Sequence, residues 1–408
     1  MRFPALRSKD FVLYTAGNAS AMVALWINRV LIGWLGWELT GLASWVGLLS
    51  FLLFAPTIVA SPLFGVLLDR IDLRRAALAS QGVLAANVSV LLVFQLTGVL
   101  TIWLLGVIAL MIGVTSSADR TIRFVLVPRI VERDAIPNAV AIHGINFNTA
   151  RLIGPAIGGL LIDAYGSDVA TMVNVVMIAP FLVVLLLVTI RDRDGPAQLR
   201  KAFFSELMDG LRHAIAHPII REAMILTCVL SLTARGVIEI LPAIADGEFH
   251  RGAQGLGQML TASGAGALLA AVSIALRRSG APVPGISLSA RLSIAGGLVS
   301  TFLLGVTGDW AFAMALVFAL GFFLTNNGID LQATIQIELS DTYRARVMSM
   351  WVVLVIGGAA MSAIALGLFA DLVGMSTTLM GSAVLGALLA VAGTVLITRA
   401  GGGGAGAT

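Results

Sequence analysis

The chain has 408 residues, of which 58% are hydrophobic and only 12% are charged. A mean hydropathy of +0.96 excludes an ordinary soluble domain, whose surface needs far more charge, and indicates an integral membrane protein. The single cysteine, Cys228, excludes an intramolecular disulfide and a multi-cysteine metal site, and we expect no metal or other cofactor.

About twelve apolar segments are long enough to span a bilayer as helices. They lie near residues 11–37, 42–68, 76–96, 100–122, 138–164, 169–190, 219–245, 254–276, 288–307, 310–335, 345–370 and 376–398. No alternation of polar and apolar residues supports a lipid-facing β-barrel, so we expect an all-α membrane fold. We divide it into an N-terminal six-helix bundle (1–190), a C-terminal six-helix bundle (219–400) and a flexible tail (401–408).

A polar linker, residues 191–218, separates the two predicted bundles. Part of it has helical period, because its apolar residues fall on one face: Phe203, Phe204, Leu207, Met208, Leu211 and Ile215. We expect a short amphipathic helix that lies at the cytoplasmic surface of the membrane and joins the two halves.

Basic residues are concentrated on one side of the predicted spans. With both termini in the cytoplasm, Arg251 is the one basic residue in an outer segment, and Arg29, Arg151 and Arg235 fall within spans. All other Lys and Arg residues lie on inner segments, as the positive-inside rule requires. The net charge of +4 therefore reports orientation rather than nucleic-acid binding, and we expect both termini in the cytoplasm.

Several motifs stand out along the chain. The loop after the second span has five charged residues among seven. With the end of that span, it reads Gly65-Val-Leu-Leu-Asp69-Arg70-Ile-Asp72-Leu-Arg74-Arg75. The first span contains Trp26-x-x-Arg29-Val30, and the fifth contains Asn148-x-Ala150-Arg151-x-x-Gly154-Pro155-x-x-Gly158-Gly159. The tenth contains Asn326 and Asn327, and the eleventh begins with Arg344-Ala-Arg346.

Together these motifs resemble the major facilitator superfamily and, within it, the enterobactin-exporter-like branch of the drug–proton antiporters. The resemblance implies export of an amphipathic small molecule, such as a siderophore or a drug. We expect a monomeric, multi-pass transporter of the bacterial inner membrane that works by alternating access, with protons as the coupling ion. Leu25 stands where many relatives carry an Asp in the first helix. This chain therefore lacks one group that could carry protons.

The charged loop and its neighbours are candidates for a gate that latches helices together. The resemblance assigns this role to Gly65, Asp69, Arg70, Asp72, Arg74 and Arg75 in the loop. Asp119 and Arg123 are four residues apart near the inner end of the fourth span, so we expect them to pair and to act with this loop. Arg344 and Arg346, at the start of the eleventh span, are also candidates for this latch.

Ionisable residues inside a membrane are costly, so each is a candidate functional residue. Arg235 and Glu239 are four apart on the predicted seventh helix, which places them on one face as a pair. Glu239 is a candidate proton carrier, with a static packing pair as the alternative. Asp330 is a second proton-coupling candidate; with Asn326 and Asn327 it forms a patch for polar substrate groups or an interhelical hydrogen-bond network.

Other polar residues are candidates for lining a central cavity. Asn18 and Arg29 share one stripe of the first helix, and Arg151 either attracts an anionic group of the substrate or balances a buried carboxylate. The full set of cavity candidates is Asn18, Arg29, His143, Asn146, Arg151, Arg235, Asn326 and Asn327.

Small residues predict close helix packing. Gly154, Pro155, Gly158 and Gly159 resemble the antiporter motif of the fifth helix and predict a tight seam between the halves. The spacing Gly159-Leu160, Asp163, Gly166 recurs as Gly367-Leu368, Asp371, Gly374. Because these sets end the fifth and eleventh spans, they indicate two internal repeats.

Two other transport functions stay open at this point. The same fold also serves a lipid or lysophospholipid flippase, or an importer working as a symporter or uniporter. An enzyme is not expected, because no nucleophile–base set, phosphate-binding glycine loop or metal-ligand cluster is present, and no catalytic residue is assigned.

Overall fold

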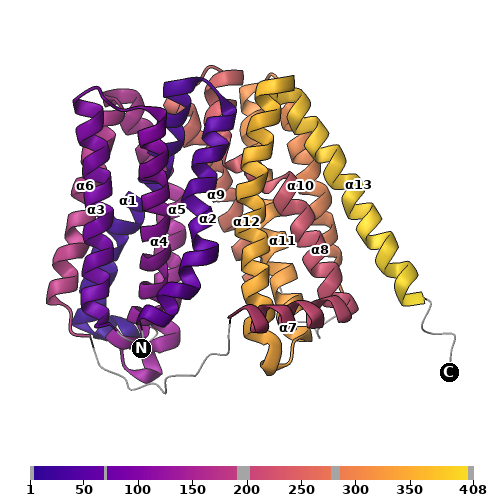
Figure 1. Ribbon diagram of the computed structural model, residues 1–408, viewed down its shortest axis with the longest axis horizontal. Coiled ribbons are helices and arrows are strands. Elements are labelled where there is room, and N and C mark those ends of the chain that lie inside the picture. Colours follow the sequence, from indigo (N-terminus) through magenta and orange to yellow (C-terminus); the bar gives the residue numbers. More distant parts are fainter. Residues whose placement is uncertain (1–3, 69–70, 191–202, 277–284, 403–408) are drawn as a thin grey trace.

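The computed structural model describes residues 4–68, 71–190, 203–276 and 285–402, and these parts of the chain are helical with no strand. Helices are the expected solution for a chain of this composition, since every backbone group then pairs within its own segment. Nine of the described helices are long and apolar enough to cross a membrane by length and composition. The helices form two bundles that stand side by side (Figure 1), so the predicted all-α membrane fold is confirmed.

The N-terminal half consists of six long helices. They are α1 (Lys9–Thr40), α2 (Ala43–Leu68), α3 (Leu73–Leu96), α4 (Ile102–Ile130), α5 (Ile136–Tyr165) and α6 (Ser167–Leu187), with short 3₁₀ turns at Pro4–Arg7 and Arg133–Ala135.

The C-terminal half begins with α8 (Pro218–Thr233), which is followed by the 3₁₀ turn η3 (Arg235–Ile238) and the π-helical turn η4 (Ala243–Glu248). It continues with α9 (Gly252–Leu276), α10 (Leu288–Val306), α11 (Trp310–Glu338), α12 (Asp341–Val373) and α13 (Met375–Gly402).

The seventh predicted span, 219–245, is therefore not one continuous helix. Gly236 packs against α12 so closely that a Cβ there would collide with the side chain of Ser362. Pro242 follows and lacks a backbone N–H to continue a helical ladder. The chain leaves α-helical geometry after Thr233 and continues as the 3₁₀ turn η3, so Arg235 and Glu239 do not share the face of an α-helix.

Helix α7 (Phe203–Ala216) occupies the segment where the sequence predicts an amphipathic helix. It lies across the end of the C-terminal half nearest the chain's N-terminus, roughly perpendicular to the spanning helices (Figure 1). The ring of His213 stacks on that of Tyr343 at 4.0 Å between centroids, which docks α7 on α12. Met208 and Ile215 are exposed, as expected for a helix whose apolar face lies in a membrane surface.

The charged loop after α2 is partly described. Asp69 and Arg70 lie outside the described residues, and Gly65 lies in the last turns of α2. Asp72 caps α3, since its carboxylate accepts a hydrogen bond of 2.8 Å from the backbone N–H of Arg75. Arg74 donates to the carbonyl oxygens of Leu186, at 3.3 Å, and Val188. The start of α3 is thereby tied to the end of α6 within the same half.

The two halves meet along two helix pairs, α2 with α12 and α5 with α9. Glycines allow these close approaches. A Cβ on Gly47 would collide with the carbonyl oxygen of Ala363, and one on Gly367 with that of Ala43. A Cβ on Gly159 would lie 2.7 Å from the carbonyl oxygen of Ala253 and from Gly257 Cα. Gly159 and Gly367, equivalent positions of the two repeats, thus each admit a helix of the other half.

The antiporter-like motif of α5 faces in two directions. Gly154 and Gly158 admit α1 of the same half, where a Cβ on Gly154 would lie 2.6 Å from Trp26 Cβ. Gly159 and the carbonyl of Pro155 face α9 of the other half, since a Cβ on Gly257 would lie 2.9 Å from that oxygen. The predicted seam between the halves therefore involves the second part of the motif, and the first part holds α5 to α1.

We expect Gly47→Ala to destabilise the protein by about 1–3 kcal/mol, because the added methyl group meets backbone that cannot move without separating α2 from α12. Gly82→Ala in α3 is the matched control, since nothing lies within 4 Å of a Cβ there; this change is expected to be neutral or slightly stabilising. Thermal unfolding of both variants in the same detergent measures the difference. Equal midpoints would show that α2 and α12 are not packed at this distance.

Candidate functional site

An ion pair joins the two halves midway along the helices. A guanidinium nitrogen of Arg29, from α1, donates to a carboxylate oxygen of Glu239, which follows η3. The side chains are 24% and 9% exposed, respectively. The guanidinium also lies over the rings of Trp26, at 5.1 Å, and Phe54, at 5.0 Å. The predicted partner of Glu239, Arg235, is therefore wrong, because the break after α8 turns the carboxylate toward α1 of the other half.

Arg235 instead contacts α11. One of its terminal nitrogens donates to the carbonyl oxygen of Leu324 at 3.2 Å. Its Nε is buried and has no hydrogen-bond partner among the described residues. Its guanidinium still interacts electrostatically with Glu239 and with Arg151 of the N-terminal half.

Arg151 lies in the same region, with its guanidinium 5.9 Å from the ring of Trp26. It interacts electrostatically with Arg29 and Glu239. Arg120 of α4 also interacts electrostatically with Arg29. The sequence analysis counted Arg120 with the inner segments, whereas the structure places this exposed residue within α4, next to Asp119.

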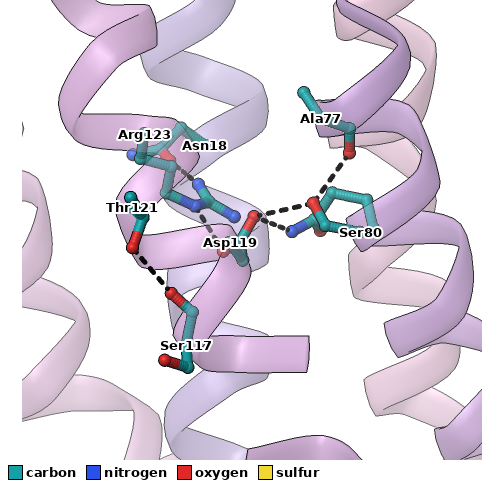
Figure 2. Close-up of polar contacts among 8 residues, drawn as sticks. Asn18, Ala77, Ser80, Ser117, Asp119, Thr121 and Arg123 are labelled. Carbon is teal, nitrogen blue, oxygen red and sulfur yellow. Dashed lines mark hydrogen bonds and ion pairs between the residues drawn. The ribbon is translucent and has the colours of Figure 1, made fainter. Parts of the chain in front are cut away.

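A second polar cluster lies inside the N-terminal half, where α1, α3 and α4 meet (Figure 2). The Nε of Arg123 donates to Asp119 at 2.6 Å, as the i, i+4 spacing predicts. Gln81 donates to the other carboxylate oxygen at 2.6 Å, and Arg123 donates to the side-chain oxygen of Asn18. The Arg123 guanidinium also lies 4.3 Å from the ring of Phe181.

This cluster changes two of the predicted roles. Asn18 is fully buried and binds Arg123, so it holds the bundle together and does not line a cavity. Asp119 and Arg123 contact α1 and α3 rather than the described residues of the charged loop, because they lie about two turns deeper along α3. Ser80, two turns into α3, marks this depth with a 3.4 Å hydrogen bond to Asp119.

His143 and Asn146 also contact α1. The side-chain amide of Asn146 donates to the carbonyl oxygen of Thr15 at 3.1 Å. The ring of His143 lies 6.5 Å from that of Tyr14. These two cavity candidates therefore help to pack α5 on α1 within the N-terminal half.

The polar stripe of α11 faces α10. Asn326 donates to Ser293 at 2.7 Å and to Ser289 at 2.9 Å, and Asn327 donates to the carbonyl oxygen of Ala290 at 3.3 Å. Asp330 accepts weaker hydrogen bonds of 3.4 Å from Asn326 and from Ser287. Of the readings that the sequence left open for this stripe, the interhelical network is the one that these contacts fit.

The remaining latch candidates lie at the start of α12. Arg344 donates to the carbonyl oxygen of Leu339 at 3.5 Å, and the guanidinium of Arg346 lies 5.9 Å from the ring of Tyr343. Both contacts stay within the C-terminal half.

The end of the bundles opposite the N-terminus holds contacts that the sequence analysis did not foresee. The carboxylate of Asp371, at the end of α12, accepts hydrogen bonds from the first backbone N–H groups of α2, at Ala43 (2.8 Å) and Ser44 (3.0 Å). The indole of Trp37 donates to Asp246 at 2.8 Å. Both contacts cross between the halves. The recurring Gly-Leu-x-x-Asp-x-x-Gly spacing was the available signal, which the sequence analysis used only as a sign of internal symmetry.

The transmembrane secretion effector family matches residues 2–401, nearly the whole chain. The chain belongs to this family. The predicted resemblance to the major facilitator superfamily is confirmed, and the members of this family and the relatives below are transporters rather than enzymes.

Individual family relatives are distant in sequence. The chain is 25% identical to the enterobactin exporter EntS of Escherichia coli O139:H28 over 337 residues, which cover 82% of this chain and 78% of that protein. The enterobactin exporter EntS of Escherichia fergusonii shows the same identity and coverage.

Solved structures share the fold. The nucleoside transporter NupG superposes with a TM-score of 0.71 at 14% identity, covering 95% of this chain and 98% of that one. A bacterial homologue of the human lysosomal transporter Spinster, in an inward-facing and occupied conformation, superposes with a TM-score of 0.72 at 13% identity, covering 96% and 97%. At these identities the likeness shows the major facilitator fold alone.

Proposed function

We propose that this transporter exports an amphipathic small molecule across the bacterial inner membrane by alternating access. The observation that carries the proposal is the distribution of contacts between the halves. The hydrogen bonds that join described residues of the two halves lie at the end opposite the N-terminus, at Asp371 and Trp37, or midway, at Arg29. The similarity to an enterobactin exporter supports the export direction.

With both termini cytoplasmic, this arrangement corresponds to a state whose outer gate is closed. The positive-inside distribution of Lys and Arg supports that orientation. Transport then requires the outer contacts to break in one part of the cycle, and we assign the latch of the inner end to the charged loops at residues 69–75 and 344–346. A ligand or proton shifts this equilibrium only through its different affinity for the two states.

Glu239 is the proton carrier that we propose. Its carboxylate binds Arg29 across the halves, so protonation would remove the charge that holds this pair together. Asp330 remains a second proposed carrier. Proton binding at Glu239 would thereby loosen one contact between the halves and favour the outward-facing state.

Flux through proteoliposomes tests the proposed function. Candidate siderophores, antibiotics and lysolipids are first screened by thermal shift of the purified protein, and each hit is then loaded into vesicles with an imposed pH gradient. We expect gradient-driven flux in the direction opposite to the protons. Flux in the same direction as the protons would identify an importer, and lysolipid as the sole transported hit would identify a flippase.

The outer gate gives a further prediction. Asp371→Ala removes a carboxylate that caps α2 from the other half; a lost cap costs about 0.5–2 kcal/mol, so the ratio of outer-open to outer-closed molecules is expected to rise about 2- to 30-fold. Spin labels at Leu42→Cys and Leu372→Cys, both exposed positions, in a Cys228→Ser background report the separation of the halves.

Asp309→Ala is the matched control for this measurement. Asp309 also caps a helix at the same end, by accepting a 2.7 Å hydrogen bond from Phe312 N–H, but this bond stays within one half. We expect its distance distribution to equal that of the parent protein. The same distribution in Asp371→Ala would contradict the assignment of Asp371 to the gate.

A further inference from the structure

The region between the halves carries more positive than negative charge. Arg29, Arg151 and Arg235 interact electrostatically there with one another or with Glu239, and Arg120 interacts with Arg29 and with Asp119. Glu239 forms its ion pair with Arg29. Because a charge at membrane depth is costly, such a residue usually has a partner of opposite sign or borders water.

Two of these arginines keep unused hydrogen-bond donors. A guanidinium has five N–H donors in a planar fork. One terminal nitrogen of Arg235 donates to the carbonyl oxygen of Leu324, and its buried Nε has no partner in the part of the chain that the structure describes. The guanidinium of Arg151 lies against the ring of Trp26. Both therefore retain donors that can bind an oxyanion.

Other arginines of the same protein are paired differently. Arg123 is buried and binds both Asp119 and Asn18. Arg291 binds Glu222 at 2.8 Å. Arg123 and Arg291 thus each have a carboxylate partner within their own half. Arg151 and Arg235 come from different halves and interact electrostatically, and neither forms an ion pair with another described residue.

We propose that Arg151 and Arg235 form a subsite for an oxyanion group of the transported molecule, such as a carboxylate, phosphate or sulfonate. The indole of Trp26 offers an aromatic face for the apolar part beside that group. Arginine suits this task because its planar fork binds oxyanions in a bidentate manner. The inference rests on the proposed function, and it narrows the substrate to amphipathic anions.

The position of the subsite links binding to conformational change. Arg151 belongs to α5 and Arg235 to η3, so an anion held by both neutralises the repulsion between two halves that carry like charges. Such a ligand binds most tightly when the two guanidinium groups are close, and it therefore has the differential affinity that alternating access needs.

Three probes with one fluorophore test the charge preference. Dansylglycine is an anion, dansylamide is neutral and dansylcadaverine is a cation, and each accepts excitation energy from tryptophan. We titrate them into the full-length protein in phosphatidylcholine nanodiscs. Dansylglycine is expected to bind at least about 10-fold more tightly than the other two, as a charge-assisted hydrogen bond predicts.

Variants locate the subsite. Arg151→Gln and Arg235→Gln are each expected to weaken dansylglycine about 10- to 100-fold and to leave dansylamide unchanged, while Arg151→Lys keeps part of the preference. Arg251→Gln is the matched control, because Arg251 also lies over a tryptophan, Trp310, at 5.4 Å, but at the outer end of α9. Variants are compared only where size-exclusion profiles match that of the parent protein.

Equal affinity of the parent protein for the three probes overturns the inference, as does an unchanged preference in both Gln variants. These outcomes do not depend on flux. A protein that prefers dansylglycine but transports nothing would contradict the proposed function and leave the subsite standing. Gradient-driven flux of a cationic substrate that survives Arg151→Gln would overturn the subsite and leave the transport function standing.

A last comparison identifies the source of the anion. The dansylglycine titration is repeated in nanodiscs that contain phosphatidylglycerol. Weaker apparent binding there supports an oxyanion subsite that a lipid headgroup occupies. Unchanged binding supports a subsite reserved for a free solute.

Discussion

Asp119→Ala is expected to lower the free energy of unfolding by about 3–5 kcal/mol, which is the usual cost of removing one partner of a buried ion pair. Arg123 is 4% exposed and would keep its charge inside the N-terminal half without a carboxylate. Gln81 would lose its acceptor in the same step. Reversible unfolding of the purified protein in mixed micelles measures the loss.

Two comparison variants make this prediction specific to burial. Glu222→Ala removes the partner of Arg291, which is 46% exposed, and its cost is expected to stay below about 1 kcal/mol. The double variant Asp119→Leu with Arg123→Met replaces both charges by apolar groups and is expected to recover most of the stability lost in Asp119→Ala. Equal losses in Asp119→Ala and Glu222→Ala would show that the cluster is hydrated.

Glu239→Gln is expected to reduce pH-driven flux by about 5- to 150-fold, the range that corresponds to an ordinary coupling free energy between two sites. Glutamine keeps the size of the side chain and still accepts a hydrogen bond from Arg29, so the fold is expected to survive. It cannot take up a proton, however, and the pairing with Arg29 no longer responds to pH. Flux in proteoliposomes with and without a pH gradient measures the effect.

The control for this variant is Glu248→Gln, since Glu248 is an exposed residue at the end of η4 in the same half. It is expected to transport like the parent protein. Asp330→Asn undergoes the same assay, because its side chain is the second proposed carrier. Full gradient-driven flux in both Glu239→Gln and Asp330→Asn would exclude these carboxylates from proton coupling.

Much of the architecture follows from local patterns. Long apolar segments interrupted by charged loops predict helices that cross a membrane, and the structure places helices in each predicted segment. The exception is the span expected at 219–245, where hydropathy stays high through Gly236 and Pro242 although the helix does not. Hydropathy measures the free energy of transfer into lipid. It does not report whether the backbone stays helical where a neighbouring helix packs against a glycine.

Sequence spacing predicts the partners of polar side chains only within one continuous helix. Spacing within one helix predicts the pair of Asp119 and Arg123, because both side chains are fixed to the same backbone. The same rule fails for Arg235 and Glu239, which the break after α8 separates. The spacing rule also cannot predict the partner of Arg29, because the contact between Arg29 and Glu239 joins residues that are 210 positions apart.

The sequence by itself determined the membrane class and the small residues at helix contacts, because composition and periodicity are local consequences of a lipid environment. The superfamily followed from the resemblance of its motifs. Only the tertiary structure decided which charges meet. The partners of Glu239, Asn18 and Asp371 depend on how helices from distant parts of the chain rotate and pack, and that rotation is set by side-chain contacts across the whole bundle rather than by any one segment.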